Sequence, residues 1–367
     1  MRVLHIINDL RVGGAEVLLK DIVPGLRKAG IEAEIAMLGA TPADSFLEAA
    51  LRDAGVPLHL PPSASLYHPR HIAGLAAQMQ GFDVVHVHLF PAQYFAAMAA
   101  QKLPRAARPV LITTEHNTTN RRRKPVWHGA DTWVYTRYAR LVCVSEAVAE
   151  TLADWVPRLR SRIRVISTAL DVDRYKNALP ADKRSVLGVP PSSPVLLCVG
   201  RLEAQKDQAT LLRALPRLPG FHVALVGDGV LRPDLEQLAR TLGVSDRVHF
   251  LGRRADVPSL LKMADVYVQP SLSEGWSIAI LEVMASAHAP IVASRAPGLL
   301  EAVENHGFLF PIGDDAALAH AVQTALASPE LCAEYRARCR DTAARHDLDG
   351  CVQDHIRLYR ESLAEKK

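Results

Sequence analysis

Two carboxylates, Glu274 and Glu282, are separated by seven residues in a stretch that could bind an anion. The preceding residues, 265–269, are short, β-branched and aromatic, which predicts a buried strand. Ser277 is a favourable N-cap for a helix running to about Ala287. A strand, a glycine-containing loop and a helix in this order place free backbone N–H groups and the positive end of a helix dipole at the carboxyl edge of a sheet. The stretch therefore predicts an anion site bracketed by two carboxylates.

Two cations follow the predicted strand 195–199 in the segment that begins at Gly200. Arg201 can bind phosphate oxygens in a bidentate manner, and Lys206 adds a compact positive charge. The residue types and their position after a strand predict a phosphate-binding loop. A solvated loop with two unrelated cations is the alternative.

A Gly-x-Gly turn, Gly227 to Gly229, follows the predicted strand 222–226. The third glycine of a dinucleotide-binding fingerprint is absent because position 232 is arginine, which disfavours a dehydrogenase. The turn could admit a ligand close to the backbone, or it could be a plain tight turn. Gly252 likewise ends the predicted strand 248–251.

Gly13 and Gly14 stand between the first predicted strand and the first predicted helix, where they could admit a phosphate or a sugar. His86 and His88 end another buried strand, and alternation places both imidazoles on one face. A metal pair would need a third ligand, and none is recognisable in the sequence. We therefore expect His86 to make structural hydrogen bonds and no metal to be bound.

The segment Glu115-His116-Asn117 follows the next strand as a polar loop suited to acceptor hydroxyls. A basic run comes next, with Trp127 close behind it: Arg121, Arg122, Arg123 and Lys124. Four cations and an aromatic ring could contact an anionic membrane or a lipid pyrophosphate. A solvated loop is the alternative, and nucleic acid is not expected because no recognition module surrounds the run.

The spacing of Glu274 and Glu282, with the arginine and lysine upstream and the glycine pair near the N-terminus, resembles the retaining nucleotide-sugar glycosyltransferases of family 4. This resemblance implies the GT-B fold, in which two Rossmann-like doubly wound parallel-sheet domains face a deep interdomain cleft. It implies that Glu274 contacts the donor sugar, that Glu282 holds the nucleotide ribose, and that Arg201 and Lys206 bind the donor diphosphate. It also implies that His88 lies near the reacting sugar.

Three groups of site residues follow from the motifs and the resemblance together. The predicted catalytic residues are Glu274, His88, Arg201 and Lys206. The predicted donor-binding residues are Gly13, Gly14, Gly200, Arg201, Lys206, Gly227, Gly252, Glu274, Gly275, Trp276, Ser277 and Glu282. The predicted acceptor-binding residues are Glu115, His116 and Asn117.

The 367 residues are too many for one ordinary core and suit two α/β domains. Strand and helix patterns alternate along both halves, which indicates βαβ units and parallel sheets. We predict an acceptor-binding domain over 1–176, a Pro-, Ala- and Ser-rich linker over 177–193, and a nucleotide-sugar-binding domain over 194–345. A helix within 346–367 could pack back on the first domain.

The five cysteines are scattered without metal-binding spacing, which is typical of reduced thiols in a cytosolic protein. No signal peptide or membrane span is recognisable, so we expect a cytoplasmic protein, at most peripheral to the inner face of the membrane. The predicted function is transfer of a sugar from a UDP- or GDP-linked donor to an acceptor hydroxyl, in polysaccharide or lipid-linked glycan biosynthesis, without a cofactor. The alternatives are a nucleotide-sugar binding protein without transferase activity and an epimerase of the same fold.

Overall fold

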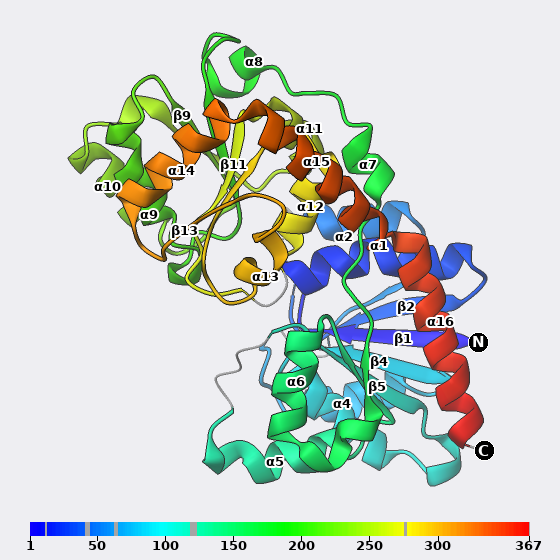
Figure 1. Ribbon diagram of the computed structural model, residues 1–367. Coiled ribbons are helices and arrows are strands. Elements are labelled where there is room, and N and C mark those ends of the chain that lie inside the picture. The colour runs from blue at the N-terminus through cyan, green and yellow to red at the C-terminus, as the bar shows by residue number, and fades with distance from the viewer. Residues whose placement is uncertain (12, 41–44, 62–64, 118–122, 275–276, 367) are drawn as a thin grey trace. The chain divides into compact units, whose positions relative to one another are not determined.

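The chain forms two compact units, and the computed structural model in Figure 1 describes residues 1–11, 13–40, 45–61, 65–117, 123–274 and 277–366 of it. The first unit comprises Met1–Ala169 and Leu348–Lys367, and the second comprises Leu170–Asp347. Within the described ranges, no helix is long and apolar enough to cross a membrane.

The first unit is built on one seven-stranded sheet. Its strands are β1 (Arg2–Ile7), β2 (Glu32–Met37), β3 (Leu58–His59), β4 (Val84–His88), β5 (Val110–Glu115), β6 (Arg140–Cys143) and β7 (Ile163–Val165). Its α-helices are α1 (Gly14–Lys28), α2 (Phe46–Asp53), α3 (Arg70–Gln78), α4 (Ala92–Lys102), α5 (Pro125–Tyr135), α6 (Glu146–Trp155) and α16 (Leu348–Lys366).

All strands of this sheet are parallel, in the order β3-β2-β1-β4-β5-β6-β7. The order reverses between β1 and β4, where His5 is paired in register with His86. In a doubly wound sheet, the crevice at such a reversal, off the carboxyl ends of the strands, is the usual place for a ligand.

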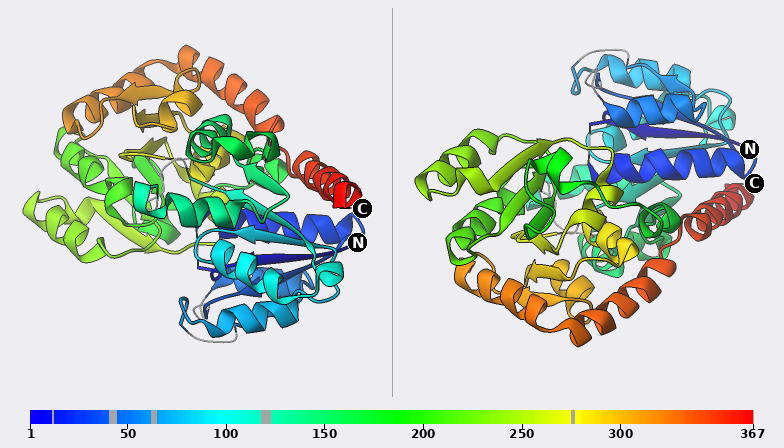
Figure 2. Two further views of the ribbon diagram at one scale, coloured as in Figure 1. Left: turned by 90° about the horizontal axis from the view of Figure 1, so that it is seen from below. Right: turned by 90° about the horizontal axis from the view of Figure 1, so that it is seen from above.

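The C-terminal helix α16 belongs to the first unit although it is the last element of the chain. It packs against α1, and its Val352, Ile356 and Tyr359 are buried in the core that α1 and β1 share. The two helices are seen side by side in Figures 1 and 2. The first unit is therefore completed by residues more than 170 positions away from the rest of it.

The second unit is built on a six-stranded parallel sheet in the order β10-β9-β8-β11-β12-β13. Its strands are β8 (Val195–Val199), β9 (His222–Val226), β10 (Val248–Gly252), β11 (Val266–Gln269), β12 (Ile291–Ser294) and β13 (Phe308–Phe310). Its α-helices are α7 (Val172–Lys176), α8 (Lys183–Leu187), α9 (Gln208–Ala214), α10 (Arg232–Thr241), α11 (Val257–Met263), α12 (Ile278–Ser286), α13 (Leu299–Val303), α14 (Asp315–Ala327) and α15 (Pro329–Ala344).

The observed division differs from the predicted boundaries at the N-terminal side of the second unit, which begins at Leu170. Helix α7 packs against α12, so residues 170–176 join the second unit rather than the first. The predicted linker contains α8, and its Leu187 and Val189 are buried in the second unit's core. Apolar burial, rather than the proline- and serine-rich composition, decides where this segment belongs.

Candidate functional site

The loops after β8 and β11 of the second unit meet at the point where the strand order reverses. The Leu272 amide donates to the Gln205 carbonyl at 2.8 Å, and the Gln205 side-chain amide donates to the Ser273 carbonyl at 2.8 Å. These two bonds connect the predicted phosphate-binding loop after β8 to the predicted anion-binding loop after β11. The structure therefore places these two motifs side by side.

Glu274 is the centre of a buried polar cluster between these loops. Its Oε1 accepts hydrogen bonds from Lys206 Nζ at 2.7 Å, Ser271 Oγ at 2.6 Å and Gln269 Nε2 at 3.0 Å. The Glu274 side chain is only 7% exposed and that of Lys206 only 19%, so the two charges form a largely desolvated ion pair. Lys206, predicted to bind an anion from a ligand, is therefore already paired with the carboxylate predicted to contact a sugar.

Arg201 differs from Lys206 in its surroundings. Its side chain is half exposed and forms an ion pair with Glu203 at 2.9 Å. An exposed pair of this kind contributes little to stability, so the guanidinium can exchange its partner at small cost.

Burial raises the pKa of the nearby Cys198 thiol to about 12, the Glu274 carboxylate adds to the rise and Lys206 opposes it. The thiol that senses Lys206 and Glu274 is therefore protonated at neutral pH.

The Gly-x-Gly turn packs against the protein's own backbone. A side chain at Gly227, whose φ is +130°, would collide with the Gly200 carbonyl, and one at Gly229 would collide with the Leu202 carbonyl. The Gly227 amide also donates to the Gly252 carbonyl at 2.8 Å. The glycines thus allow the ends of β8, β9 and β10 to approach one another, which is a structural reason for the motif whether or not a ligand also lies there.

Helix α12 begins as predicted, with the Ser277 hydroxyl accepting from the Ile280 amide at 3.3 Å. One and a half turns later, Glu282 is 8% exposed and accepts a 2.6 Å hydrogen bond from the Tyr175 hydroxyl of α7. Tyr175 therefore helps to hold the carboxylate predicted to bind a ribose. Gly275 and Trp276, which were also predicted to bind the donor, lie outside the described residues.

In the first unit, Gly13 and Gly14 lie at the start of α1 as predicted, with Gly13 in the N-cap position. The Glu16 carboxylate lies where a Cβ at Gly13 would be. A carboxylate is favourable at the positive end of a helix, and here it occupies the place at which the sequence predicted a phosphate or sugar.

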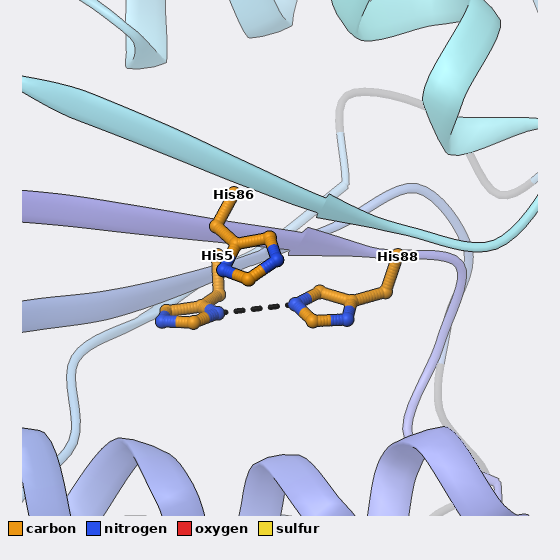
Figure 3. A group of neighbouring side chains, drawn as sticks. All are labelled: His5, His86 and His88. Atoms are coloured by element: carbon orange, nitrogen blue, oxygen red, sulfur yellow. Dashed lines mark hydrogen bonds between the residues drawn. The ribbon is translucent and has the colours of Figure 1, made fainter. Parts of the chain in front are cut away.

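Imidazoles gather at the reversal point of the first sheet, as Figure 3 shows for three of them. His5 Nδ1 lies 3.2 Å from His88 Nε2, and His88 Nδ1 lies 3.2 Å from His116 Nε2. His86 and His88 share one face of β4, as alternation predicted, with ring centroids 4.6 Å apart. One ligand nitrogen from each of His5, His86 and His88 lies within 4.8 Å of the others. The third imidazole that the sequence did not reveal is thus supplied by β1.

His86 makes the structural hydrogen bonds expected of it, to Thr114 Oγ1 and the Tyr359 hydroxyl, both at 2.7 Å. Burial lowers the pKa of His5 to about 3 and that of His116 to about 4. Burial also lowers the pKa of His86 and His88 well below the usual range, and the neighbouring imidazoles lower it further. These four imidazoles are therefore neutral at neutral pH.

The predicted acceptor loop is divided between the interior and the surface. Glu115 is buried, and its Oε1 accepts 2.6 Å hydrogen bonds from Gln93 Nε2 and the Tyr135 hydroxyl. His116 is half-buried against His88, whereas Asn117 is exposed. Of the basic run, Arg123 and Lys124 precede α5, and Arg121 and Arg122 lie outside the described residues.

Sequence reasoning missed two residues at these sites, His5 and Tyr175. His5 stands in the middle of an apolar strand, so only the register that pairs it with His86 reveals its place. Tyr175 lies 107 residues from Glu282 and in a stretch assigned to the other domain.

Each half of the chain matches a family model of glycosyltransferases. Residues 12–174 match the family model described as Glycosyltransferase Family 4, and residues 181–346 match the model described as Glycosyl transferases group 1. The chain is 34% identical over 231 residues to the lipopolysaccharide core biosynthesis glycosyltransferase LpsE of Rhizobium meliloti, a match that spans 62% of this chain and 64% of LpsE. It is 27% identical to the putative glycosyltransferase EpsD of Bacillus subtilis over 76% of each chain.

The fold is similar to that of Anabaena HepE, solved in complex with UDP and glucose. The TM-score is 0.83 at 22% identity, covering 97% of this chain and 98% of HepE. The lipopolysaccharide glycosyltransferase WaaG aligns with a TM-score of 0.74 at 17% identity, covering 97% of this chain and 99% of WaaG. The predicted GT-B fold of two doubly wound parallel-sheet domains is confirmed.

Proposed function

Because the chain belongs to the group 1 and family 4 glycosyltransferases, we propose that it transfers a sugar from a nucleotide diphosphate donor to an acceptor hydroxyl with retention of configuration. The observation that carries the proposal is the Glu274–Lys206 pair, which joins the loops after β8 and β11 where the strand order reverses. A cation, a carboxylate and a helix N-terminus at such a place suit a sugar linked to a diphosphate.

The leaving diphosphate gains negative charge as the bond to the sugar breaks. Arg201, which is half exposed beside its Glu203 partner, can turn to the phosphate oxygens. Lys206 can move from the Glu274 carboxylate to the diphosphate as the donor binds, which would free Glu274 for the hydroxyls of the sugar. Preorganised charge at the leaving group is the largest catalytic contribution available to such a site, and no metal is required for it.

The donor is proposed to be UDP- or GDP-linked, since HepE was solved with UDP and glucose. The acceptor is proposed to be a growing polysaccharide or a lipid-linked glycan, since LpsE is a lipopolysaccharide core biosynthesis glycosyltransferase. In the first unit, His116 and Asn117 are the residues proposed to face the acceptor, with His88 lying 3.2 Å from His116.

The donor site is tested by titrating the protein with UDP and with GDP in a calorimeter, without an acceptor. Arg201→Ala and Lys206→Met should each weaken nucleotide binding and reduce turnover on the order of 100-fold. Arg217→Ala, which removes an exposed pair with Asp315, is the matched control and should change neither. Wild-type nucleotide affinity in both site variants would refute the diphosphate clamp.

The reaction is tested by incubating UDP-glucose and GDP-mannose with undecaprenyl-diphosphate-linked sugars and lipopolysaccharide cores, in the presence of a chelator. Retention predicts that the product has the anomeric configuration of the donor. Loss of activity that Mg²⁺ restores would contradict metal independence. Tight nucleotide binding without any product would favour the alternative function of a nucleotide-sugar binding protein. An isomer formed from the nucleotide sugar alone would favour the alternative function of an epimerase.

We also propose that α5 contacts an anionic membrane from the cytoplasmic side. Val126, Trp127 and Trp133 are exposed on this helix by 82%, 46% and 41%. The Arg137 guanidinium lies over the Trp133 ring at 4.8 Å, and Lys124 precedes the helix. Exposed aromatic side chains flanked by cations are typical of helices that lie in the membrane interface.

Sedimentation with phosphatidylglycerol vesicles tests this contact. Binding should exceed that to phosphatidylcholine vesicles, since each basic residue near an anionic surface contributes about 1 kcal/mol. A double variant, Val126→Ser with Trp127→Ser, should reduce binding, whereas Val230→Ser, an equally exposed site in the second unit, should not. Equal binding to both lipids would refute the proposal.

A further inference from the structure

The imidazoles at the reversal point of the first sheet are an unusual set of buried groups. His5 and His86 are fully buried and His88 is 3% exposed. They come from the neighbouring strands β1 and β4, and their side chains converge in Figure 3. We propose that His5, His86 and His88 form a binding site for one transition-metal cation of the zinc class.

The distances are close to those that coordination needs. In a tetrahedral zinc site with bonds of about 2.0–2.1 Å, the ligand nitrogens are about 3.3 Å apart. His5 Nδ1 and His88 Nε2 are 3.2 Å apart, and one nitrogen from each of the three residues lies within 4.8 Å of the others. The ligand nitrogens must therefore approach one another by at most roughly 1.5 Å to bind the metal.

A second shell that would orient two of the three ligands, His86 and His88, is already in place. A metal-bound imidazole normally holds a hydrogen-bond partner on its other nitrogen. The far nitrogen of His88 lies 3.2 Å from His116 Nε2. His86 has the hydroxyls of Thr114 and Tyr359 on its two nitrogens, so one partner remains when the metal replaces the other.

The third proposed ligand, His5, differs from the other two in the surroundings of its ring nitrogens. Its Nε2 is buried and has no hydrogen-bond partner among the described residues. A metal bound at Nδ1 would leave Nε2 unpaired, so the nitrogen of His5 that bears on the site is Nδ1. Nδ1 faces His88 Nε2 at 3.2 Å, which is the hydrogen-bond-distance contact of this fully buried ring among the described residues. A metal held at Nδ1 would explain why a polar ring is buried in the middle of this apolar strand.

The donor set restricts the class of cation. Three nitrogen donors without a carboxylate or thiolate suit Zn²⁺ and its neighbours Co²⁺, Ni²⁺ and Cu²⁺, and they do not suit Mg²⁺ or Ca²⁺. Three protein ligands would leave a fourth position for water. This inference does not rest on the proposed transfer reaction, and the site would not be the diphosphate site of the second unit.

The test is titration of the full chain with Co²⁺, followed by the visible absorption of the tetrahedral ion and by competition with Zn²⁺. One equivalent should bind. His5→Asn should weaken binding by more than the roughly 10- to 100-fold that loss of a second-shell partner costs. Asparagine is chosen because its side-chain amide can keep the contact that Nδ1 makes. His249→Asn is the matched control, because His249 Nε2 lies 3.1 Å from His222 Nδ1 in the second unit and forms a competing imidazole pair.

A measurement without any substitution covers the case in which His5→Asn does not fold. Zinc X-ray absorption of the wild-type protein should show three imidazole nitrogens at about 2.0 Å. Two imidazoles or fewer, or a sulfur ligand, would overturn the proposal. It would also be overturned if no stoichiometric Co²⁺ binding occurred, or if His249→Asn abolished binding while folded His5→Asn retained it.

Discussion

Lys206 and Glu274 form a buried ion pair, so the effect of replacing one on the free energy of unfolding should depend strongly on the presence of the other. Replacing Lys206 with methionine leaves the Glu274 carboxylate 7% exposed, with hydrogen bonds from Gln269 and Ser271 but no opposite charge. Replacing Glu274 with glutamine instead leaves a buried ammonium. Breaking a buried pair from one side costs about 3–5 kcal/mol. Each single variant should therefore lower the free energy of unfolding of the second unit by about that amount.

The double variant Lys206→Met with Glu274→Gln should be much less destabilised than the sum of the two. It removes both charges and so leaves neither uncompensated, while the glutamine carbonyl can still accept from Ser271 or Gln269. The Coulomb energy of two unit charges about 4 Å apart is about 4 kcal/mol at an effective dielectric constant of 20. We therefore expect a coupling free energy of about 2–4 kcal/mol.

The assay is a double-mutant cycle in urea. Hydrogen exchange of peptides from residues 195–310 reports on the second unit separately, because the chain has two units and a whole-chain transition would mix them. The exposed pair Arg232–Glu236, at 2.9 Å in the same unit, is the matched control and should give only about 0.3–0.5 kcal/mol. Additive losses at Lys206 and Glu274 would refute the view that the pair is a desolvated unit.

Three further predictions concern single positions. Tyr175→Phe removes the hydroxyl that donates a hydrogen bond to Glu282. It should lower the free energy of unfolding in urea by about 1.5–3 kcal/mol and raise the Kd for UDP in a calorimetric titration. Gly229→Ala forces a methyl group into a carbonyl and should cost about 1–3 kcal/mol, whereas Gly350→Ala, which meets nothing within 4 Å in a helix, should stabilise by about 1 kcal/mol. Burial raises the pKa of Cys198 to about 12 from 9.0, so its contribution to stability is complete below about pH 9 and is lost as pH rises from 9 to 12. Between pH 8 and 10 the wild type should lose about 1.4 kcal/mol that Cys198→Ala does not lose, and equal losses in the two proteins would contradict the assignment.

The sequence by itself determined what depends on near neighbours. The alternation of apolar stretches gave the parallel sheets, and the cap at Ser277 marked the start of α12 because its hydroxyl binds an amide three residues away. The carboxyl ends of parallel strands share one edge of a sheet, so the loops holding Arg201 and Glu274 were expected on the same side. Turn and cap chemistry act over a few residues, which is why such features can be read locally.

Only the tertiary structure decided which polar groups pair across the sheets. Lys206 meets Glu274 over a sequence separation of 68, and His5 meets His88 over 83. Tyr175 and α16 were placed by burial of apolar surface against distant elements, not by any pattern of their own. These contacts depend on strand register and on which helix covers which core, because a side chain's partner across a sheet is fixed by the neighbouring strand rather than by its own sequence neighbours.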